Sequence, residues 1–313
     1  GGTIPARTDG TIVEFYIQAN AAGGNRKFPD AAPGKTCLYI VQNNPVPDSN
    51  LNVFRIVITD ENHAGLLSSS NCNAYPPDDT RFDCTFIYGN KAYYNSQIRR
   101  RSGARCGPKY SYKIYLPPGY RFRGADRFDL NHEKNDRSFL RNQIVNHLVK
   151  YMGLPWARSE YVHTRYRNSY AGVHLYTDSR GQDDFLERHL PTDYDGNLYK
   201  ATAGWQTATA WNENHGIYQK ETNEWLNDWS DLDELGDITS NEPEATYEAE
   251  MRRVIDVVNW GRSFAVWGVT CLIDSPWHIH NQNYRLYRRF SDNRFMHILY
   301  DFDDTYWDTM WDN

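Results

Sequence analysis

The hydrophobic and polar positions of this chain alternate as strands do in some segments and follow a helical period in others. Strand-like alternation is clearest over residues 52–60 (NVFRIVITD) and in two hairpin patterns, residues 84–101 and 160–179. Residues 246–273 are largely apolar with helical periodicity and predict buried helices. Because strands and helices do not follow a regular βαβ order, the sequence predicts an α+β fold with a mostly antiparallel sheet.

A second helix is predicted in the segment that ends at Gly153. One face of this helix carries Phe139, Ile144, Leu148 and Tyr151, and Gly153 with Pro155 ends it. Residues 201–245 are polar and rich in Trp and give few periodic signals. We interpret them as an insertion.

The N-terminal 45 residues form a separate pattern. Two strand signals, at residues 11–19 and 37–42, are joined by a loop, and a linker rich in Pro and Asn follows at 43–50. Two strands alone cannot bury a sheet. Residues 1–45 are therefore either a partial β-module or strands added to the main sheet, and residues 46–313 form the main domain.

A hairpin near the C-terminus carries the most suggestive chemistry. The polar loop 274–283 contains Asp274 and Asn283, two strands meet at a Ser291–Asn293 turn, and the return strand runs into Asp301 and Asp303. Carboxylates and amides at the ends of one hairpin lie close together, which suits a divalent cation bound to phosphate oxygens. An ordinary acidic turn fits the same spacing.

Other chemistries use some of the same residues. A pair of carboxylates such as Asp274 and Asp301 also suits a glycosidase. His278 and His280 are separated by one residue in a loop, a spacing that fixes no metal geometry, so we interpret them as loop residues.

A second candidate segment is basic. Residues 99–109 form a Gly-containing loop between two strands, with Arg101 and Lys109 among its cations. Such a loop can bind nucleotide phosphates through backbone N–H groups and cationic side chains, although a simple basic turn is the commoner explanation. Lys113 and Lys200 lie within strand patterns, where a half-buried lysine needs a partner. Each could contact phosphate or face solvent.

Composition narrows the function classes. The net charge is -6, and no Lys/Arg run indicates nucleic acid or an anionic membrane as a partner. No apolar run reaches the roughly 20 residues of a membrane-spanning helix. The 10 Trp and 23 Tyr residues are typical of extracellular and carbohydrate-active proteins. We therefore expect a soluble, monomeric, secreted or surface protein.

The five cysteines support the same location. No pair has the spacing of a zinc site. Cys72 with Cys84 and Cys37 with Cys106 are plausible disulfides, which are typical of exported proteins. Cys271 lies in an apolar run and is expected to be a buried free thiol.

Several segments, taken in order, resemble the spore-coat CotH kinase-like family. They are IRRRSGARCGPKYSYKIYL (98–116), DLNHEKNDRSFLRNQIVNHLVKYMGLP (129–155), GVHLYTDS with DDFLER and GNLYK (172–200), and HNQNYRLYR with FMHILYDFDDTYW (280–307). Residues 1–45 are similar to the end of an Ig-like or lamin-tail-associated β-module that often precedes such domains.

The resemblance implies an atypical, two-lobed protein-kinase-like fold. Such a domain binds ATP with Mg²⁺ (Mn²⁺ and Ca²⁺ being alternatives) and phosphorylates Ser or Thr of secreted or surface proteins. By position, Asp301 matches the metal-binding aspartate with Asp303 beside it, Asp274 the catalytic-loop aspartate, and Asn283 the asparagine that begins the following strand. Lys113 and Lys200 match the family's two strand lysines, either of which could contact the phosphates.

This chain departs from the family pattern in several places. Serines of the glycine loop are lost at Arg101–Arg105, and Asp178 stands where the family often has glutamate. Tyr300 replaces the tryptophan before the metal aspartate. These departures leave a second interpretation open: an inactive structural or adhesive module that keeps the fold and contacts carbohydrate through exposed Trp and Tyr.

Overall fold

The computed structural model describes residues 5–43, 49–68, 80–101, 109–133, 136, 138–178, 183–202, 218–272, 274–276, 282–303 and 305–306. The chain divides into two compact units. The first comprises Gly1–Lys134 and Ser159–Asp178, and the second comprises Asn135–Arg158 and Ser179–Asn313. Both contain antiparallel strands and helices, so the predicted α+β class is confirmed. No helix among the described residues is long and apolar enough to cross a membrane.

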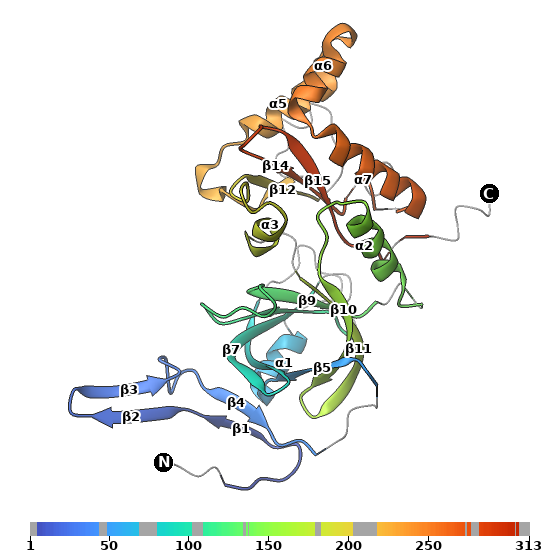
Figure 1. Cartoon of the computed structure of the whole chain (residues 1–313). Helices are drawn as coiled ribbons and strands as arrows, with labels where there is room; N and C mark the ends of the chain where they lie inside the picture. The colour runs from blue at the N-terminus through green and yellow to red at the C-terminus, as the bar shows by residue number, and fades with distance from the viewer. Residues whose placement is uncertain are drawn as a thin grey trace. The chain divides into compact units, whose positions relative to one another are not determined.

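The first unit is built on a closed seven-stranded barrel in the order β10-β11-β9-β8-β7-β6-β5 (Figure 1). Its strands are β5 (Asn52–Val57), β6 (Phe82–Tyr88), β7 (Lys91–Arg100), β8 (Tyr112–Tyr115), β9 (Arg127–Asn131), β10 (Ser159–Tyr166) and β11 (Ser169–Asp178). The parallel pairing of β10 with β5 closes the barrel, while the other neighbours are antiparallel. Closure removes exposed strand edges. The mostly antiparallel pairing agrees with the prediction, and the closure of the sheet into a barrel is what the sequence did not predict.

Aromatic side chains fill the barrel. Phe54 contacts Phe86, Phe128 and Tyr176 with ring centroids 5.2–6.0 Å apart. Helix α1 (Asp60–Ser68) follows β5 and places Leu66 in the same core. The sequence alternation arises here because every second residue of each strand faces this interior.

Two short strand pairs precede the barrel. Strand β1 (Ile12–Phe15) pairs with β4 (Cys37–Ile40), and β2 (Ile17–Ala21) pairs with β3 (Gly24–Phe28) to form an arm (Figure 1). Strand β4 contacts the barrel strand β6, where the backbone N–H of Leu38 donates to Thr85 Oγ1 at 3.3 Å. These strands belong to the first compact unit. The domain boundary at residue 46 and the likeness to a β-module stay predictions.

The second unit contains a four-stranded antiparallel sheet in the order β13-β12-β14-β15. The strands are β12 (Asn197–Ala201), β13 (Tyr218–Lys220), β14 (Tyr284–Arg288) and β15 (Phe295–Leu299). The helical elements are α2 (Arg141–Tyr151), α3 (Asp183–His189), η2 (Glu224–Leu226), α5 (Ser230–Asn241), α6 (Glu244–Val254) and α7 (Val257–Thr270). Thus residues 201–245, interpreted above as an insertion, supply a strand and a helix.

Alternate residues of this sheet contact different helices. One face, including Tyr199, Leu286 and Phe295, packs in a core with α2, α5 and α7. On the opposite face, Leu198, Tyr287 and Ile298 contact Phe185 and Leu186 of α3. The helical segment predicted at 246–273 divides at Asp256, which accepts a hydrogen bond from Asn259 N at 3.0 Å and caps α7. Unlike the prediction, α6 is mostly exposed.

The predicted disulfides are corrected. Cys37 and Cys84 are buried free thiols, and their proposed partners Cys72 and Cys106 lie outside the described residues. Cys84 belongs to the apolar core of the barrel, so it is buried by packing rather than by a bridge. Cys271 is free as predicted but only partly buried, at the left-handed end of α7.

Candidate functional site

The C-terminal hairpin forms as predicted and brings its two ends together. Strands β14 and β15 pair from Tyr284 opposite Leu299 to Arg288 opposite Phe295. At the open end, Tyr300 N donates to the carbonyl of Asn283 at 3.2 Å, and Asn283 Nδ2 donates to the carbonyl of Asp301 at 3.3 Å. Both Asn283 and Asp301 have positive φ, 63° and 62°. Asn and Asp tolerate this conformation better than other non-glycine residues, and such strain is concentrated at functional sites.

Asp274 belongs to the same group. Its side chain is buried, and its Oδ2 accepts hydrogen bonds from Asn283 Nδ2 at 3.0 Å and from Gln282 Nε2 at 3.2 Å. Asn283 therefore joins Asp274 to the Asp301 backbone. The structure brings Asp274, Asn283 and Asp301 together, as their positions at the ends of the hairpin predict.

Helix α2 fixes the segment after Asp301. The buried Asn142 accepts a hydrogen bond from Phe302 N at 3.0 Å, and Arg141 Nη1 donates to the carbonyl of Asp303 at 3.4 Å. The start of α2 is itself held by Asp136, whose Oδ2 accepts from Arg141 N at 2.8 Å. Burial opposes ionisation of Asp136, but hydrogen bonds from Ser138 and Arg141 outweigh it and lower its pKa.

The donor atoms of this group suit a hard cation. Asn283 uses Nδ2 for both hydrogen bonds, which leaves its oxygen Oδ1 to act as a ligand beside the Asp301 carboxylate. The Asp301 carboxylate makes no hydrogen bond or ion pair with the described residues. No three His, Cys, Asp or Glu side chains in the described part of the chain lie close enough to hold a metal alone. The residues thus fit Mg²⁺ shared with substrate phosphates rather than an all-protein cage.

The outer face of the barrel wall in the first unit carries a largely buried ionic cluster. Lys113 on β8 lies directly opposite Asp129 on β9, with Nζ 3.3 Å from Asp129 Oδ1. Arg101 Nε lies 3.6 Å from the same oxygen, and Arg101 Nη1 also donates to Asn131 Oδ1. Two cations therefore share one carboxylate.

Burial and charge shift the pKa values in this cluster. Burial lowers the pKa of Lys113 to about 8, with Asp129 acting in the opposite direction. Burial also opposes ionisation of Asp129, but Arg101 and Lys113 outweigh it and hold its pKa below the usual range. Lys113 is therefore a cation that loses its proton near neutral pH more readily than an exposed lysine does.

Lys109 has a different environment. Its Nζ donates to the backbone carbonyls of His132, at 3.1 Å, and of Val173. Burial lowers its pKa to about 8, opposed by Glu133. These contacts tie the end of the basic loop to the strands β9 and β11, which is a structural role. Residues 102–108 of the loop lie outside the described residues.

The structure does not bring Asp178 to the face of the barrel wall that carries Lys113. Asp178 on β11 lies opposite Phe128, whereas Asp129, the partner of Lys113, lies opposite Thr177. Because neighbouring strand residues point to opposite faces, Asp178 and Lys113 belong to opposite faces of the barrel wall.

Lys200 belongs to the second unit. It lies on β12 between Gln219 and Arg285, on the face that also carries Leu198 and α3. Arg285 donates to Glu221 Oε1 at 3.2 Å and lies 4.3 Å from the ring centre of Tyr300. Lys113, in the first unit, faces the carboxylate of Asp129 directly across its strand pair.

The comparison with known protein families decides the family. A family model described as CotH kinase protein matches residues 97–312. The chain belongs to the CotH kinase family. The match begins within β7 and includes Arg101, Lys113, Asp274, Asn283 and Asp301. No curated protein matches the chain.

Sequence reasoning on this CotH kinase family domain missed three supporting residues, one in the first unit and two in the second. Asp129 pairs with Lys113, Asp136 accepts a hydrogen bond from the first residue of α2, and Gln282 donates to Asp274. Asp129 gave the clearest signal, because it stands between Phe128 and Leu130 in a strand pattern. A buried carboxylate at such a position needs a cation.

Proposed function

We propose that this domain is a secreted kinase that transfers the terminal phosphoryl group of ATP, with Mg²⁺, to Ser or Thr hydroxyls of secreted or surface proteins. The observation that carries the proposal is the group at the open end of the β14–β15 hairpin, where Asn283 links Asp274 to Asp301. Membership of the CotH kinase family supports it. The two-lobed, kinase-like fold that the family resemblance implies is part of the proposal.

The acidic group supplies the metal ligands and the base. Mg²⁺, when bound, neutralises charge on the phosphates. The Asp301 carboxylate and Asn283 Oδ1 would hold this ion, and Asp303 is the next residue that could add a ligand. Asp274, held by Asn283 and Gln282, accepts a hydrogen bond from the attacking hydroxyl and orients it. Phosphoryl transfer requires little more from the protein than such positioning and charge stabilisation.

The basic cluster supplies a phosphate-binding cation. Lys113 is the lysine that we assign to ATP, because Asp129 fixes its side chain while Arg101 shares the same carboxylate. An ammonium group that is held in place loses less side-chain entropy when phosphate binds. Lys109 serves the structure, since two backbone carbonyls already accept its hydrogen bonds.

A transfer assay with labelled ATP tests the proposal. The purified chain is incubated with ATP labelled at the γ-phosphate, with or without Mg²⁺, and with casein as a general Ser/Thr acceptor. We expect Mg²⁺-dependent labelling that falls on the order of 100-fold or more in Asp274→Asn and Asp301→Asn. Asp292→Asn, in the exposed turn of the same hairpin, is the matched control and keeps the parental rate. Full labelling by Asp301→Asn would contradict the metal assignment.

Thermal shifts separate the kinase from an inactive module. ATP with Mg²⁺ raises the melting temperature of a nucleotide-binding domain by mass action. A shift without any phosphoryl transfer would indicate a nucleotide-binding pseudokinase. No shift with ATP, together with a shift caused by oligosaccharides, would favour an adhesive module instead.

A further inference from the structure

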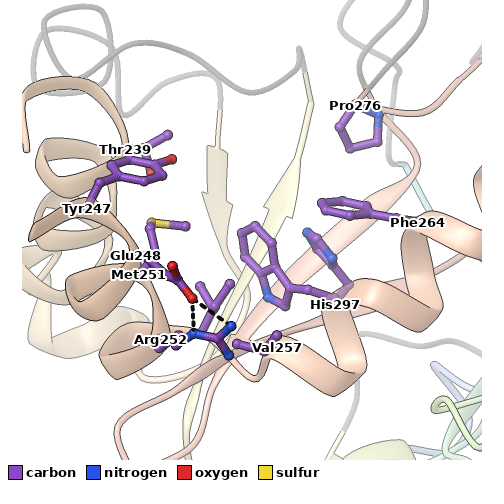
Figure 2. Close-up of a pocket in the computed structure, with 11 residues that line it drawn as sticks. Thr239, Tyr247, Glu248, Met251, Arg252, Val257, Phe264, Pro276 and His297 are labelled. Atoms are coloured by element: carbon purple, nitrogen blue, oxygen red, sulfur yellow. Dashed lines mark hydrogen bonds and ion pairs between the residues drawn. The ribbon is translucent and has the colours of Figure 1, made fainter. Parts of the chain in front are cut away.

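Helices α6 and α7 of the second unit line an apolar groove that the proposed kinase reaction does not use. Its volume is about 650 Å³. Apolar side chains spaced three or four residues apart line it from both helices: Tyr247, Met251 and Ile255 along α6 and at its end, and Val257, Trp260 and Phe264 along α7. Residues at this spacing share one face of a helix. Figure 2 shows Tyr247 and Met251 on one side of the groove and Phe264 on the other. Each helix therefore contributes an apolar stripe to one wall.

Part of each stripe is accessible to a partner. Tyr247 is 38% exposed and Val257 is 40% exposed, whereas Ile255 and Trp260 are buried. Exposed apolar surface that is gathered in a groove is typical of interaction sites on soluble proteins. Burying the two exposed side chains against a partner would remove their apolar surface from water, which favours binding.

The backbone of the neighbouring strand indicates how a partner binds. Strand β15 is the edge strand of its sheet, and its residue His297 also lines the groove. The carbonyl of Phe295 accepts from Asp256 N at 2.9 Å, and the Asn259 side chain bonds both the N–H and the carbonyl of His297, at 2.7 and 3.3 Å. These backbone groups are therefore not available for the addition of a strand. The groove must bind through side chains, as grooves that accept an amphipathic helix do.

The helical hairpin of α5 and α6 beside the groove is acidic. Residues 230–254 contain eight Asp and Glu residues but only two arginines, and both arginines form ion pairs with glutamates of the same hairpin. Around the α5–α6 turn, Asp237 accepts a hydrogen bond from the Asn241 amide and Glu242 accepts one from Thr246, so neutral groups are their recorded donors.

Glu244 brings this negative charge to the groove. It lies three residues before Tyr247 on α6, so the two side chains are neighbours on the helix surface. The end of the groove at Tyr247 is therefore acidic. Such a charge attracts a cationic partner at low ionic strength, and salt screens the attraction.

We propose that this groove binds a basic amphipathic helix of a partner protein. The apolar face of that helix fills the groove between α6 and α7, and its Lys and Arg side chains face the acidic α5–α6 turn. The charge disfavours two other occupants. A second copy of the chain would bring two acidic hairpins together, and an anionic membrane would be repelled.

The test titrates the full chain into three fluorescent peptides of about 14 residues, or four helical turns, and follows their anisotropy. The helical probe is LKKLLKLLKKLLKL, the strand probe alternates Leu and Lys throughout, and the acidic probe is the helical one with Glu in place of every Lys. We expect saturable binding of the helical probe, with the strand and acidic probes each at least about tenfold weaker. Equal affinity for the helical and strand probes would mean that charge alone is recognised and would overturn the proposal, as would no binding of the helical probe.

Variants place the binding. The double variant Tyr247→Ser/Val257→Ser removes the two exposed apolar contacts without changing charge, and it should weaken the helical probe about tenfold or more. Tyr151→Ser/Val258→Ser is the matched control, because both residues are exposed in the same unit and neither lines the groove. All four side chains are at least partly exposed, so both variants should melt near the parental temperature. Equal effects of the two would place binding elsewhere and reject this site.

A charge variant and the oligomeric state complete the test. Glu244→Gln should weaken the helical probe about threefold at low salt and have no effect in about 0.5 M NaCl. Glu61→Gln, an exposed change in the first unit, is its control and should have no effect at either salt concentration. If the two act alike at low salt, the basic partner is rejected. If sedimentation shows a dimer that Tyr247→Ser/Val257→Ser dissociates, a second copy occupies the groove and the proposal fails.

Discussion

Asn283 precedes strand β14 and Asp301 follows strand β15, so both lie at the open end of one hairpin. The Asn283 side chain donates a hydrogen bond to the Asp301 carbonyl at 3.3 Å. Both residues have a left-handed backbone conformation. The same amide group also donates to the Asp274 carboxylate at 3.0 Å. Asn283 thus positions the candidate base and the candidate metal ligand at once, and it is the residue through which the two are coupled.

Replacing Asn283 with glycine should therefore impair metal use more than it impairs folding. Glycine keeps the positive φ without strain but removes both hydrogen bonds and the amide oxygen. We expect Asn283→Gly to lower the rate of phosphoryl transfer on the order of 100-fold and to raise the Mg²⁺ concentration needed for half-maximal rate. Initial rates measured over a Mg²⁺ series give both quantities.

Gln282→Ala is the matched control for this experiment. Gln282 donates one hydrogen bond to the same Asp274 oxygen, at 3.2 Å, but does not touch Asp301. Its removal should lower the rate modestly and leave the Mg²⁺ requirement unchanged. If both variants shift the Mg²⁺ dependence equally, Asn283 is not a metal ligand.

The buried Lys113 predicts a pH dependence of ATP binding. Its pKa is lowered to about 8 because burial disfavours the ammonium form. Phosphate attracts only the protonated form, so the dissociation constant of ATP should rise about tenfold between pH 7 and pH 9. Lys113→Arg, which stays protonated, should flatten this profile. Isothermal titration at several pH values measures it.

Two arguments separate the predicted loss of ATP affinity at high pH from unfolding of the chain and from titration of Lys109. Because the pKa of Lys113 is lower in the folded chain than the unfolded value of about 10.4, this group makes the free energy of unfolding rise with pH between about 8 and 10.4. Its titration therefore does not weaken ATP binding through unfolding. Lys109→Arg should leave the profile unchanged, since Lys109 already donates to backbone carbonyls. If Lys109→Arg flattened the pH profile of ATP binding and Lys113→Arg did not, Lys109 would be the lysine that contacts the phosphates.

Local patterns in the sequence predicted which residues of the hairpin lie together better than they predicted the fold. The hairpin was predictable because one turn joins β14 and β15, and this turn brings Asn283 near Asp301. Barrel closure was not predictable, because it depends on the parallel pairing of β5 with β10, which lie far apart in sequence. Asp129 was missed because its role depends on β8 and β9 being neighbours in that barrel.

Helix α2 illustrates why hydropathy alone was insufficient. The sequence predicted a buried face containing Ile144 and Tyr151, but these side chains are 49% and 81% exposed. The core instead receives Val145 and Val149, together with the buried amides Asn142 and Asn146. Asn142 accepts from Phe302 N at 3.0 Å and Asn146 donates to the carbonyl of Ala157 at 2.6 Å. Amides that satisfy buried backbone groups look like surface residues in a hydropathy pattern.

Asp136 should contribute a measurable part of the stability of the second unit. Asp136→Ala leaves Arg141 N at the start of α2 without its acceptor, and such a loss costs about 1–3 kcal/mol. Because the folded pKa of Asp136 is lowered, this contribution is complete above the unfolded pKa of about 3.9 and is lost as the pH falls through the folded pKa. Urea unfolding at neutral and acidic pH measures it.

The exposed Asp126 provides the control for this stability prediction. Its side chain is 65% exposed, so Asp126→Ala should change the free energy of unfolding by less than about 0.5 kcal/mol. The free energies of unfolding of the parent and of Asp136→Ala should converge at acidic pH. If their difference stays the same there, the charge of the Asp136 carboxylate is not its source.

The three free thiols of the described residues should differ in reactivity. Burial raises the pKa of Cys84 and of Cys37, and thiols react as thiolates, so both should resist alkylation of the native protein. Cys271 is partly exposed and should react first. In denaturant without reductant, iodoacetamide should label all three, and mass spectrometry of peptides identifies each site. If Cys37 or Cys84 were labelled only after reduction, that residue would be in a disulfide and the free-thiol assignment would fail.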